Sequence, residues 1–124
     1  MALTEFGNSY YTYKFTHDDD LGTATTQNVT NGAATVYSVF VDNTANAGAF
    51  SFLKMYDTLP DGGIVPASTE PDYIFKVDVG ARRQFLFPSG LPITSGLSLR
   101  CVQSATTSNV ADPASNVIVT VLFK

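Results

Sequence analysis

The chain has 124 residues, of which 44% are hydrophobic and 15% charged, so it is long enough for one domain with its own core and too apolar for a disordered segment. Seven Lys and Arg residues against eleven Asp and Glu residues give a formal net charge of −4, which excludes the basic surface that attracts nucleic acids. The single cysteine excludes an internal disulfide bond. No stretch approaches the ~20 apolar residues of a membrane helix and the N-terminus lacks a signal-peptide pattern, so we expect a protein that folds in a cytosol.

The N-terminal segment begins with a short, partly apolar arm at about residues 1–7, which ends at a glycine. In the following stretch, Tyr10–Thr16, the side chains of Tyr11, Tyr13 and Phe15 alternate with more polar ones. This alternation is typical of a half-buried strand with one solvated face. We expect the arm and the rest of residues 1–124 to belong to a single domain.

The run His17-Asp18-Asp19-Asp20 is the one cluster with the side chains of a metal site. Hard cations such as calcium take several oxygen ligands from a flexible loop. No spaced acidic motif accompanies these aspartates, and adjacent residues of an extended segment point to opposite sides. We therefore expect a solvated acidic loop without a metal ion; a cation site is the alternative.

Two apolar runs, Ala34–Asp42 and Ala49–Tyr56, carry hydrophobic side chains on both faces when they are read as strands. Such strands belong in the middle of a layered β domain. Asn31-Gly32 predicts a turn before the first run. The link Asp42–Gly48 is rich in Asn, Ala and Gly, which suit a tight reversal, so we predict that the two runs form an antiparallel pair.

The C-terminal half alternates between short strands and segments rich in Pro, Gly and small polar residues. We predict strands at Tyr73–Val79, Arg82–Pro88, Leu97–Val102 and Val117–Phe123, and loops at Asp57–Pro71, Ser89–Ser95 and Ser104–Asn116. Seven or eight short strands without a helical period predict one all-β sandwich, either a jelly roll, which we slightly favour, or an immunoglobulin-like fold. The predicted core residues are Phe50, Phe52, Leu53, Phe75, Val77, Leu97, Leu99, Val119 and Val121.

Candidate catalytic residues are few. Cys101 is in phase with Leu97 and Leu99, which predicts a buried thiol, and His17 is the only histidine that could serve as its base. No pattern brings two acidic residues together, and no serine carries a nucleophile motif. We therefore expect a protein that is not an enzyme and that has no catalytic residues, cofactor or metal ion.

The candidate interface residues lie near the N-terminus, and they are Leu3, Phe6, Tyr10, Tyr11 and Tyr13. Tyrosine has an apolar body and a polar tip and is enriched at protein–protein interfaces. A row of exposed tyrosines can also stack on sugars, but the chain has no tryptophan. We expect a protein contact here, with carbohydrate binding as the alternative.

Four stretches carry a family resemblance: VDNTANAGAFSFLKMYD, PDYIFKV, FLFPSGLPITSGLSLRCVQ and NVIVTVLFK. In them an Asn-rich turn precedes a strand with Leu-Lys-x-Tyr, an apolar strand follows a proline, Phe-Pro-x-Gly-Leu comes next, and a late strand closes the chain. This arrangement, which covers roughly Asp42–Lys124, resembles small proteins of tailed bacteriophages.

The resemblance implies a virion component with a compact β fold, either a capsid decoration (cement) protein or a fibre-associated module. Its partners would be other virion proteins, the major capsid protein or fibre subunits, and it would be made and assembled in the host cytoplasm. We expect a homo-oligomer, a trimer in the first instance, with no nucleic-acid or membrane partner. A receptor- or carbohydrate-binding module of a phage fibre or capsid surface is the alternative.

Overall fold

The computed structural model describes residues 3–7, 13–58 and 63–124, and for residues 3–7 it describes the backbone. The regular structure is all-β, which confirms the predicted fold class. The strands are β1 (Leu3–Gly7), β2 (Lys14–Leu21), β3 (Ala34–Asp42), β4 (Ser51–Asp57), β5 (Tyr73–Val77), β6 (Arg82–Ile93), β7 (Leu97–Val102) and β8 (Val117–Phe123). In this part of the chain, no helix is long and apolar enough to cross a membrane.

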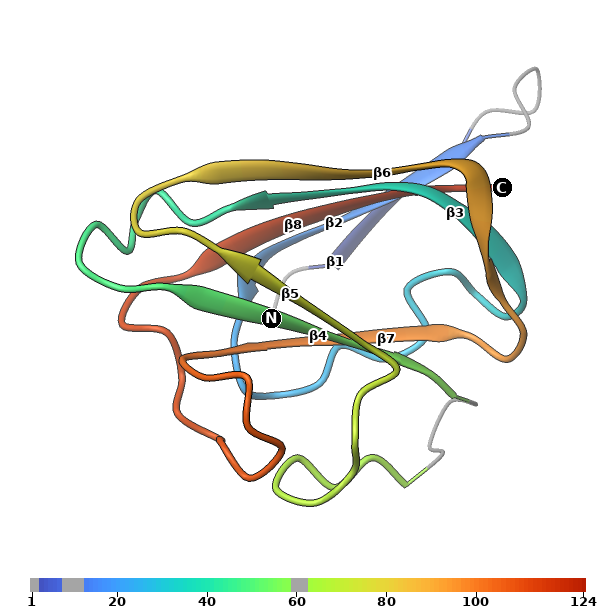
Figure 1. The fold of residues 1–124 in the computed structure, drawn as a ribbon. Coiled ribbons are helices and arrows are strands. Elements are labelled where there is room, and N and C mark those ends of the chain that lie inside the picture. The colour runs from blue at the N-terminus through green and yellow to red at the C-terminus, as the bar shows by residue number, and fades with distance from the viewer. Residues whose placement is uncertain (1–2, 8–12, 59–62) are drawn as a thin grey trace.

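The strands form two antiparallel sheets that pack face to face (Figure 1). The order is β1-β2-β8-β3-β6 in the five-stranded sheet and β5-β4-β7 in the three-stranded sheet. The segment between β2 and β3 runs along β7, because the N–H groups of Thr26 and Val29 donate to the carbonyls of Leu99 and Leu97 at 2.8 and 2.7 Å.

This order distinguishes the two candidate sandwiches. From the outside inwards, β2 pairs with β8, the segment after β2 with β7, β3 with β6, and β4 with β5. The chain therefore folds as one long antiparallel hairpin that wraps into two sheets, which is the topology of a jelly roll. An immunoglobulin-like fold would instead pair strands that follow one another in sequence.

The core lies between the two sheets. The five-stranded sheet contributes Val36, Val39, Val41, Val117, Val119, Val121 and Phe123, and the three-stranded sheet contributes Leu53, Met55, Val77, Leu97, Leu99 and Cys101. The prediction of a buried side chain is confirmed for Leu53, Val77, Leu97, Leu99, Val119 and Val121. Phe75 is half-buried and packs against Phe85, with ring centroids 4.5 Å apart, where β5 and β6 approach each other.

Two predicted core residues lie elsewhere. Phe50 is 43% exposed just before β4, and the Lys76 ammonium lies 3.9 Å from the centre of its ring. Phe52 is half-buried on the outer side of β4. The predicted alternation of this run is right, but the side that carries Leu53 and Met55 faces the core, because those side chains meet the opposite sheet.

The predicted antiparallel pair of Ala34–Asp42 and Ala49–Tyr56 is wrong. These runs become β3 and β4, which lie in different sheets. The Asn43 side chain explains the crossing: its amide donates to the carbonyls of Ala49 and Asp78, both at 3.1 Å, and its oxygen accepts from the Ser51 hydroxyl at 2.6 Å. A buried asparagine thus holds the connection in a wide turn between the sheets, where a tight hairpin was expected.

The predicted loop Ser89–Ser95 is largely strand. β6 continues to Ile93 through Pro88 and Pro92, because it is an edge strand whose proline nitrogens need no partner on the open side. Its pairing with β3 shifts register between Val36 and Ser38, so the chain bulges there. Gly90 has φ +82° in this bulge, and a Cβ on it would lie 2.3 Å from the Thr35 Cγ2.

The N-terminal segment is also more regular than predicted. The arm is an edge strand, β1, which pairs with β2 from Leu3 opposite Asp18 to Gly7 opposite Lys14. The strand expected at Tyr10–Thr16 begins at Lys14 and continues to Leu21, so that the acidic run lies within β2. A β1 strand on the same domain corrects the expectation that the arm is too short to form an element.

Candidate interaction surface

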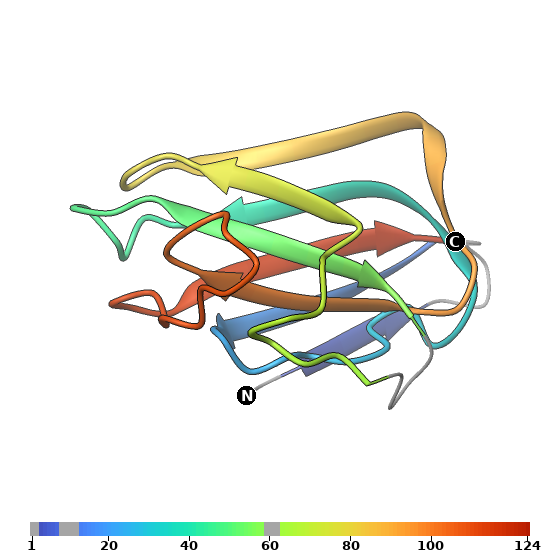
Figure 2. The same ribbon diagram turned by 60° about the horizontal axis from the view of Figure 1, so that its bottom comes forward.

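The outer surfaces of the two sheets differ. Residues 63–72 and 103–116 lie over the outer surface of the three-stranded sheet, on the side away from the other sheet (Figure 2). Beneath these loops the strands carry four buried polar or amphipathic side chains, Lys54, Tyr56, Ser98 and Arg100. This surface is therefore a second, polar interior, and it is closed to a partner protein.

Arg100 connects the covering loops to the sheet. Its side chain is fully buried, and its guanidinium donates to the carbonyl of Pro66 at 2.6 Å and to that of Asn109 at 3.1 Å, one in each loop. It also donates to the Tyr56 hydroxyl at 2.9 Å. These bonds pair the loops' backbone acceptors, which would be costly to leave unpaired once buried.

Lys54 lies on the same surface and is also fully buried. Its ammonium donates to the carbonyl of Thr106 at 2.5 Å. Burial, together with the positive charge of Arg100, lowers the pKa of the Lys54 ammonium from its ordinary value. The sequence signal for both residues is a single cation inside an otherwise apolar strand, FLKMY and LSLRCV, which the sequence reasoning passed over.

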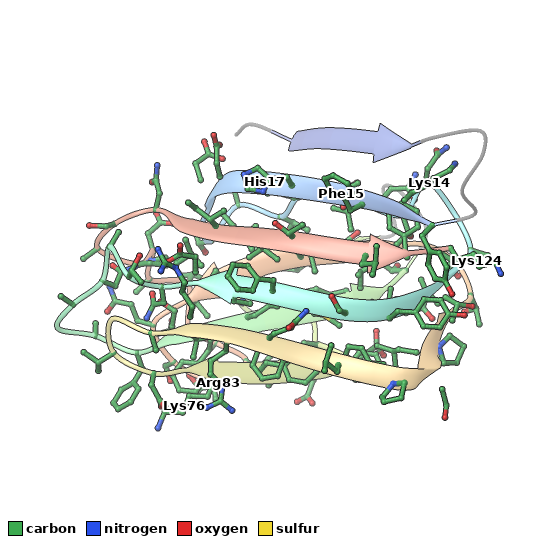
Figure 3. The ribbon with its side chains drawn as sticks, turned by 90° about the horizontal axis from the view of Figure 1, so that it is seen from above. Lys14, Phe15, His17, Lys76, Arg83 and Lys124 are labelled. Atoms are coloured by element: carbon green, nitrogen blue, oxygen red, sulfur yellow. The ribbon has the colours of Figure 1, made fainter. Side chains whose placement is uncertain are left out.

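No segment of the described chain covers the outer surface of the five-stranded sheet, which faces the viewer in Figure 3. Its exposed large hydrophobic side chains are Tyr13 (47% exposed), Phe15 (40%) and Leu86 (63%). Half-buried Tyr37, Phe40, Ile118 and Leu122 complete the apolar part of this surface. We call this surface, defined by these seven residues, the open face.

The sheet register arranges the open face in rows that cross the strands. One row holds Phe15, Leu122, Ser38 and Leu86, on β2, β8, β3 and β6 in that order. The next row holds His17, Thr120, Phe40 and Gln84, with the His17 Nδ1 2.9 Å from the Thr120 Oγ1. Neither row contains an acidic side chain, a lysine or an arginine, so the middle of the open face is apolar and weakly polar.

Charged side chains lie at the two ends of the open face. At one end the Lys124 ammonium lies 5.6 Å from the centre of the Tyr13 ring, which in turn makes an edge contact with Tyr37 at 5.3 Å between centroids. At the other end Asp42 pairs with Arg82, with Nε and Oδ2 3.0 Å apart. The arrangement of an uncharged centre and a charged rim is typical of a protein contact surface.

The predicted interface residues are only partly placed. Tyr13 lies on the open face. Leu3 and Phe6 lie in β1, where the register pairs Phe6 with Phe15, and their side chains are not described; Tyr10 and Tyr11 lie outside the described residues. The sequence reasoning missed Leu86, because it placed strand Arg82–Pro88 without deciding which of its faces meets the core.

The prediction of a solvated acidic loop is wrong for Asp18. Its side chain is 1% exposed, and its carboxylate accepts from the Thr26 hydroxyl at 2.5 Å and from the Asp20 N–H at 3.1 Å. Burial raises the pKa of the Asp18 carboxyl above its ordinary value, although the hydrogen bond from Thr26 opposes the shift. A register shift between Asp18 and Leu21 gathers the three aspartates, whose ligand atoms lie within 4.8 Å of one another.

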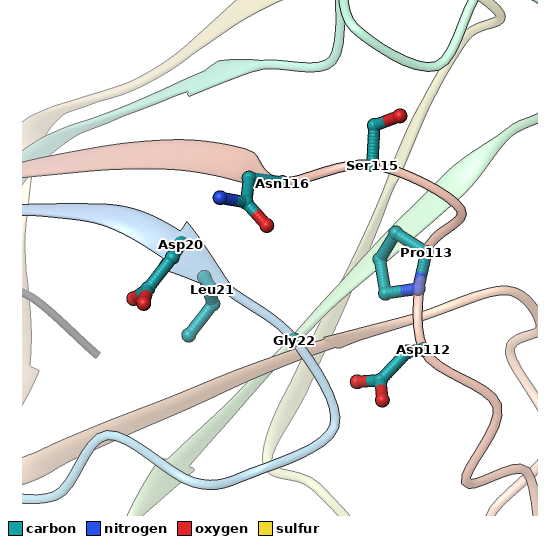
Figure 4. Close-up of a pocket in the computed structure, with 7 residues that line it drawn as sticks. All are labelled: Asp20, Leu21, Gly22, Asp112, Pro113, Ser115 and Asn116. Atoms are coloured by element: carbon teal, nitrogen blue, oxygen red, sulfur yellow. The ribbon is translucent and has the colours of Figure 1, made fainter.

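A polar pocket of about 300 Å³ opens beside this cluster (Figure 4). It is lined by Asp20, Leu21, Gly22, Asp112, Pro113, Ser115 and Asn116. The Asp112 carboxylate accepts from the Thr23 N–H at 2.7 Å, and the Ser115 N–H donates to the Asn46 side chain at 2.8 Å. These bonds attach residues 112–115 to neighbouring segments, and we assign the pocket no ligand.

The two candidates for nucleophile and base do not meet. Cys101 is fully buried on the core side of β7, where burial raises the pKa of its thiol to about 12. His17 lies on the open face of the other sheet. The prediction of a buried thiol is confirmed, and a Cys–His pair is ruled out by this arrangement.

The chain matches no protein-family model, no curated protein and no solved structure. The arrangement of its own side chains is therefore the basis for a functional proposal.

Proposed function

We propose that this protein is a non-enzymatic structural subunit of a bacteriophage particle, a capsid decoration protein that binds other virion proteins through its open face. The observation that carries the proposal is the contrast between the two sheet surfaces. One is covered by loops that Arg100 holds in place, whereas the other presents Phe15, Leu86 and Tyr13. A protein that served only as a free globular domain would gain stability by covering both surfaces.

The character of the open face supports a protein partner. Its two central rows are uncharged, and aromatic side chains are concentrated at one end, where Tyr13 and Tyr37 contact each other. Contiguous exposed apolar surface of this kind usually marks an interaction site. The sheet also supplies a rigid platform, because β2, β8 and β3 each pair on both sides.

The phage assignment rests on the sequence resemblance of Asp42–Lys124 to small tailed-phage proteins. The structural role is supported by the separation of Cys101 from His17, which leaves no nucleophile with an adjacent base. The carbohydrate alternative is less well supported, because the face of the Tyr13 ring is occupied by Lys124 and its neighbour is Tyr37 at an edge. A sugar would have to displace that ammonium to stack on the ring.

The test is binding to particles of the phage that encodes this chain, prepared without it. Wild-type protein should co-sediment with these particles, and cryo-electron microscopy should place it on their surface. Leu86→Asp puts a charge on the open face and should abolish binding, whereas Val65→Asp should not, because the equally exposed Val65 lies in a loop on the opposite side. Binding that survives Leu86→Asp, or saturable sugar binding without particle binding, would overturn the proposal.

A further inference from the structure

The open face has an internal symmetry that identifies a partner. Its apolar row, Phe15–Leu122–Ser38–Leu86, runs straight across four strands of the sheet. On one side of this row lie Tyr13, Tyr37 and Lys124, and on the other lie His17, Thr120 and Phe40. We propose, as an extension of the function proposed above, that the open face binds the open face of a second copy of this chain about a two-fold axis along the apolar row.

With the axis along this row, each residue of the row meets its own counterpart. Leu86 faces Leu86, Leu122 faces Leu122 and Phe15 faces Phe15, which is the self-complementary contact that a two-fold dimer requires. The aromatic pair Tyr13 and Tyr37 of one copy then covers His17 and Phe40 of the other. The small side chain of Ser38 leaves room for the larger ones beside it.

The charges select this axis over the other in-plane one. If the two-fold axis ran parallel to the strands through β8, the Lys124 ammonium groups of both copies would lie against each other. With the axis across the strands, each Lys124 lies over the uncharged row of the partner and the two ammonium groups are on the order of 13 Å apart, at about 3.3 Å per residue. Like charges in direct contact at an interface are strongly unfavourable, so the crossing axis is preferred.

The size of the open face sets the strength of the contact. Five strands at about 4.8 Å spacing and rows spanning six or seven residues at about 3.3 Å give roughly 500 Å² per copy. Two copies therefore bury on the order of 1,000 Å², which is at the lower limit for a specific interface. We expect reversible association at micromolar concentration. Face-to-face contact closes with two copies, so the inferred assembly is a dimer and not the trimer expected from the sequence.

The test is analytical ultracentrifugation of the purified full chain over a micromolar concentration series. Wild type should show a monomer–dimer equilibrium. Leu86→Asp sets two carboxylates against each other at the axis and should weaken dimerisation at least tenfold, while the matched variant Val65→Asp should dimerise like wild type. Circular dichroism melts of all three proteins establish that each is folded.

A wild-type protein that stays monomeric, or a Leu86→Asp variant that dimerises like Val65→Asp, overturns the dimer. In either case particle binding through the open face can still be found, so the proposed function is judged by its own experiment. Conversely, a dimer that is sensitive to Leu86→Asp but never associates with particles supports the self-contact and contradicts the decoration role.

Discussion

Buried ionisable groups are the least expected residues of this protein. Lys54, Arg100 and Asp18 are each at most 1% exposed, in a chain that carries only 15% charged residues. Burial of a charge is costly unless hydrogen bonds compensate for it. Arg100 has such bonds to two loops, whereas the pKa values of Lys54 and Asp18 shift toward their neutral forms. The two shifted groups should therefore couple folding stability to pH.

For Lys54 the folded-state pKa lies below the ordinary value of the unfolded chain. Between those two values the unfolded chain binds more protons, so the free energy of unfolding should rise as the pH increases. Lys54→Met removes this titration. Urea unfolding from pH 7 to pH 10 should show wild type gaining stability relative to Lys54→Met. A constant difference between the two proteins over this range would show that Lys54 stays charged in the fold.

For Asp18 the sign is opposite, because its folded-state pKa lies above the ordinary value. The folded protein holds the extra proton, so wild type should gain stability relative to Asp18→Asn as the pH falls toward 4. At neutral pH the amide avoids the buried charge and still accepts from Thr26, so Asp18→Asn should melt higher than wild type. Asp18→Ala leaves the Thr26 hydroxyl unpaired and should cost about 1–3 kcal/mol. Equal melting of the Asn and Ala variants would contradict this role.

At the scale of elements, the sequence predicts strands well where hydrophobic alternation is uninterrupted. Ala34–Asp42, Leu97–Val102 and Val117–Phe123 coincide with β3, β7 and β8. Prediction fails where one polar side chain or one sheet position overrides local preference. Asn43 sends β3 and β4 into different sheets, and an edge position lets β6 run through two prolines. Such partners are distant in sequence, so alternation and turn propensity do not reveal them.

The candidate surface was partly predictable for the same reason. Alternation in Tyr10–Thr16 placed Tyr13 and Phe15 on one side, and that side belongs to the open face. Leu86 could not be assigned, since its strand is apolar on both sides and only the sheet order decides which side meets the core. The covered surface was not predicted at all, because it depends on loops folding back onto Lys54 and Arg100.

The bulge in β6 gives a prediction at the same scale. Gly90→Ala places a Cβ 2.3 Å from the Thr35 Cγ2 at a backbone φ of +82°, which other residues rarely adopt. We expect a loss of about 1–3 kcal/mol in the free energy of unfolding, measured by urea titration. Thr35→Ser removes the clashing methyl group, so the double variant should recover part of the loss. If Gly90→Ala is neutral, the register shift between β3 and β6 is not as described.

The whole molecule is organised by its two unequal surfaces, and Arg100 is the residue whose loss should separate their roles. Arg100→Met removes the donors of Pro66 and Asn109 and leaves two buried carbonyls unpaired at about 1–3 kcal/mol each. We expect a lower free energy of unfolding and faster hydrogen exchange in residues 63–72 and 103–116. Arg82→Met, which removes an exposed ion pair with Asp42, is the matched control and should change stability by less than about 1 kcal/mol.

The same variant tests whether the two surfaces are independent. The open face lies on the other side of the core from the Arg100 loops, so at temperatures where Arg100→Met remains folded its dimerisation and particle binding should equal those of wild type. Leu86→Asp should show the reverse pattern, with protected loops and lost association. Loss of association in both variants would mean that the covering loops take part in the contact, and the division into a closed surface and a binding surface would then be wrong.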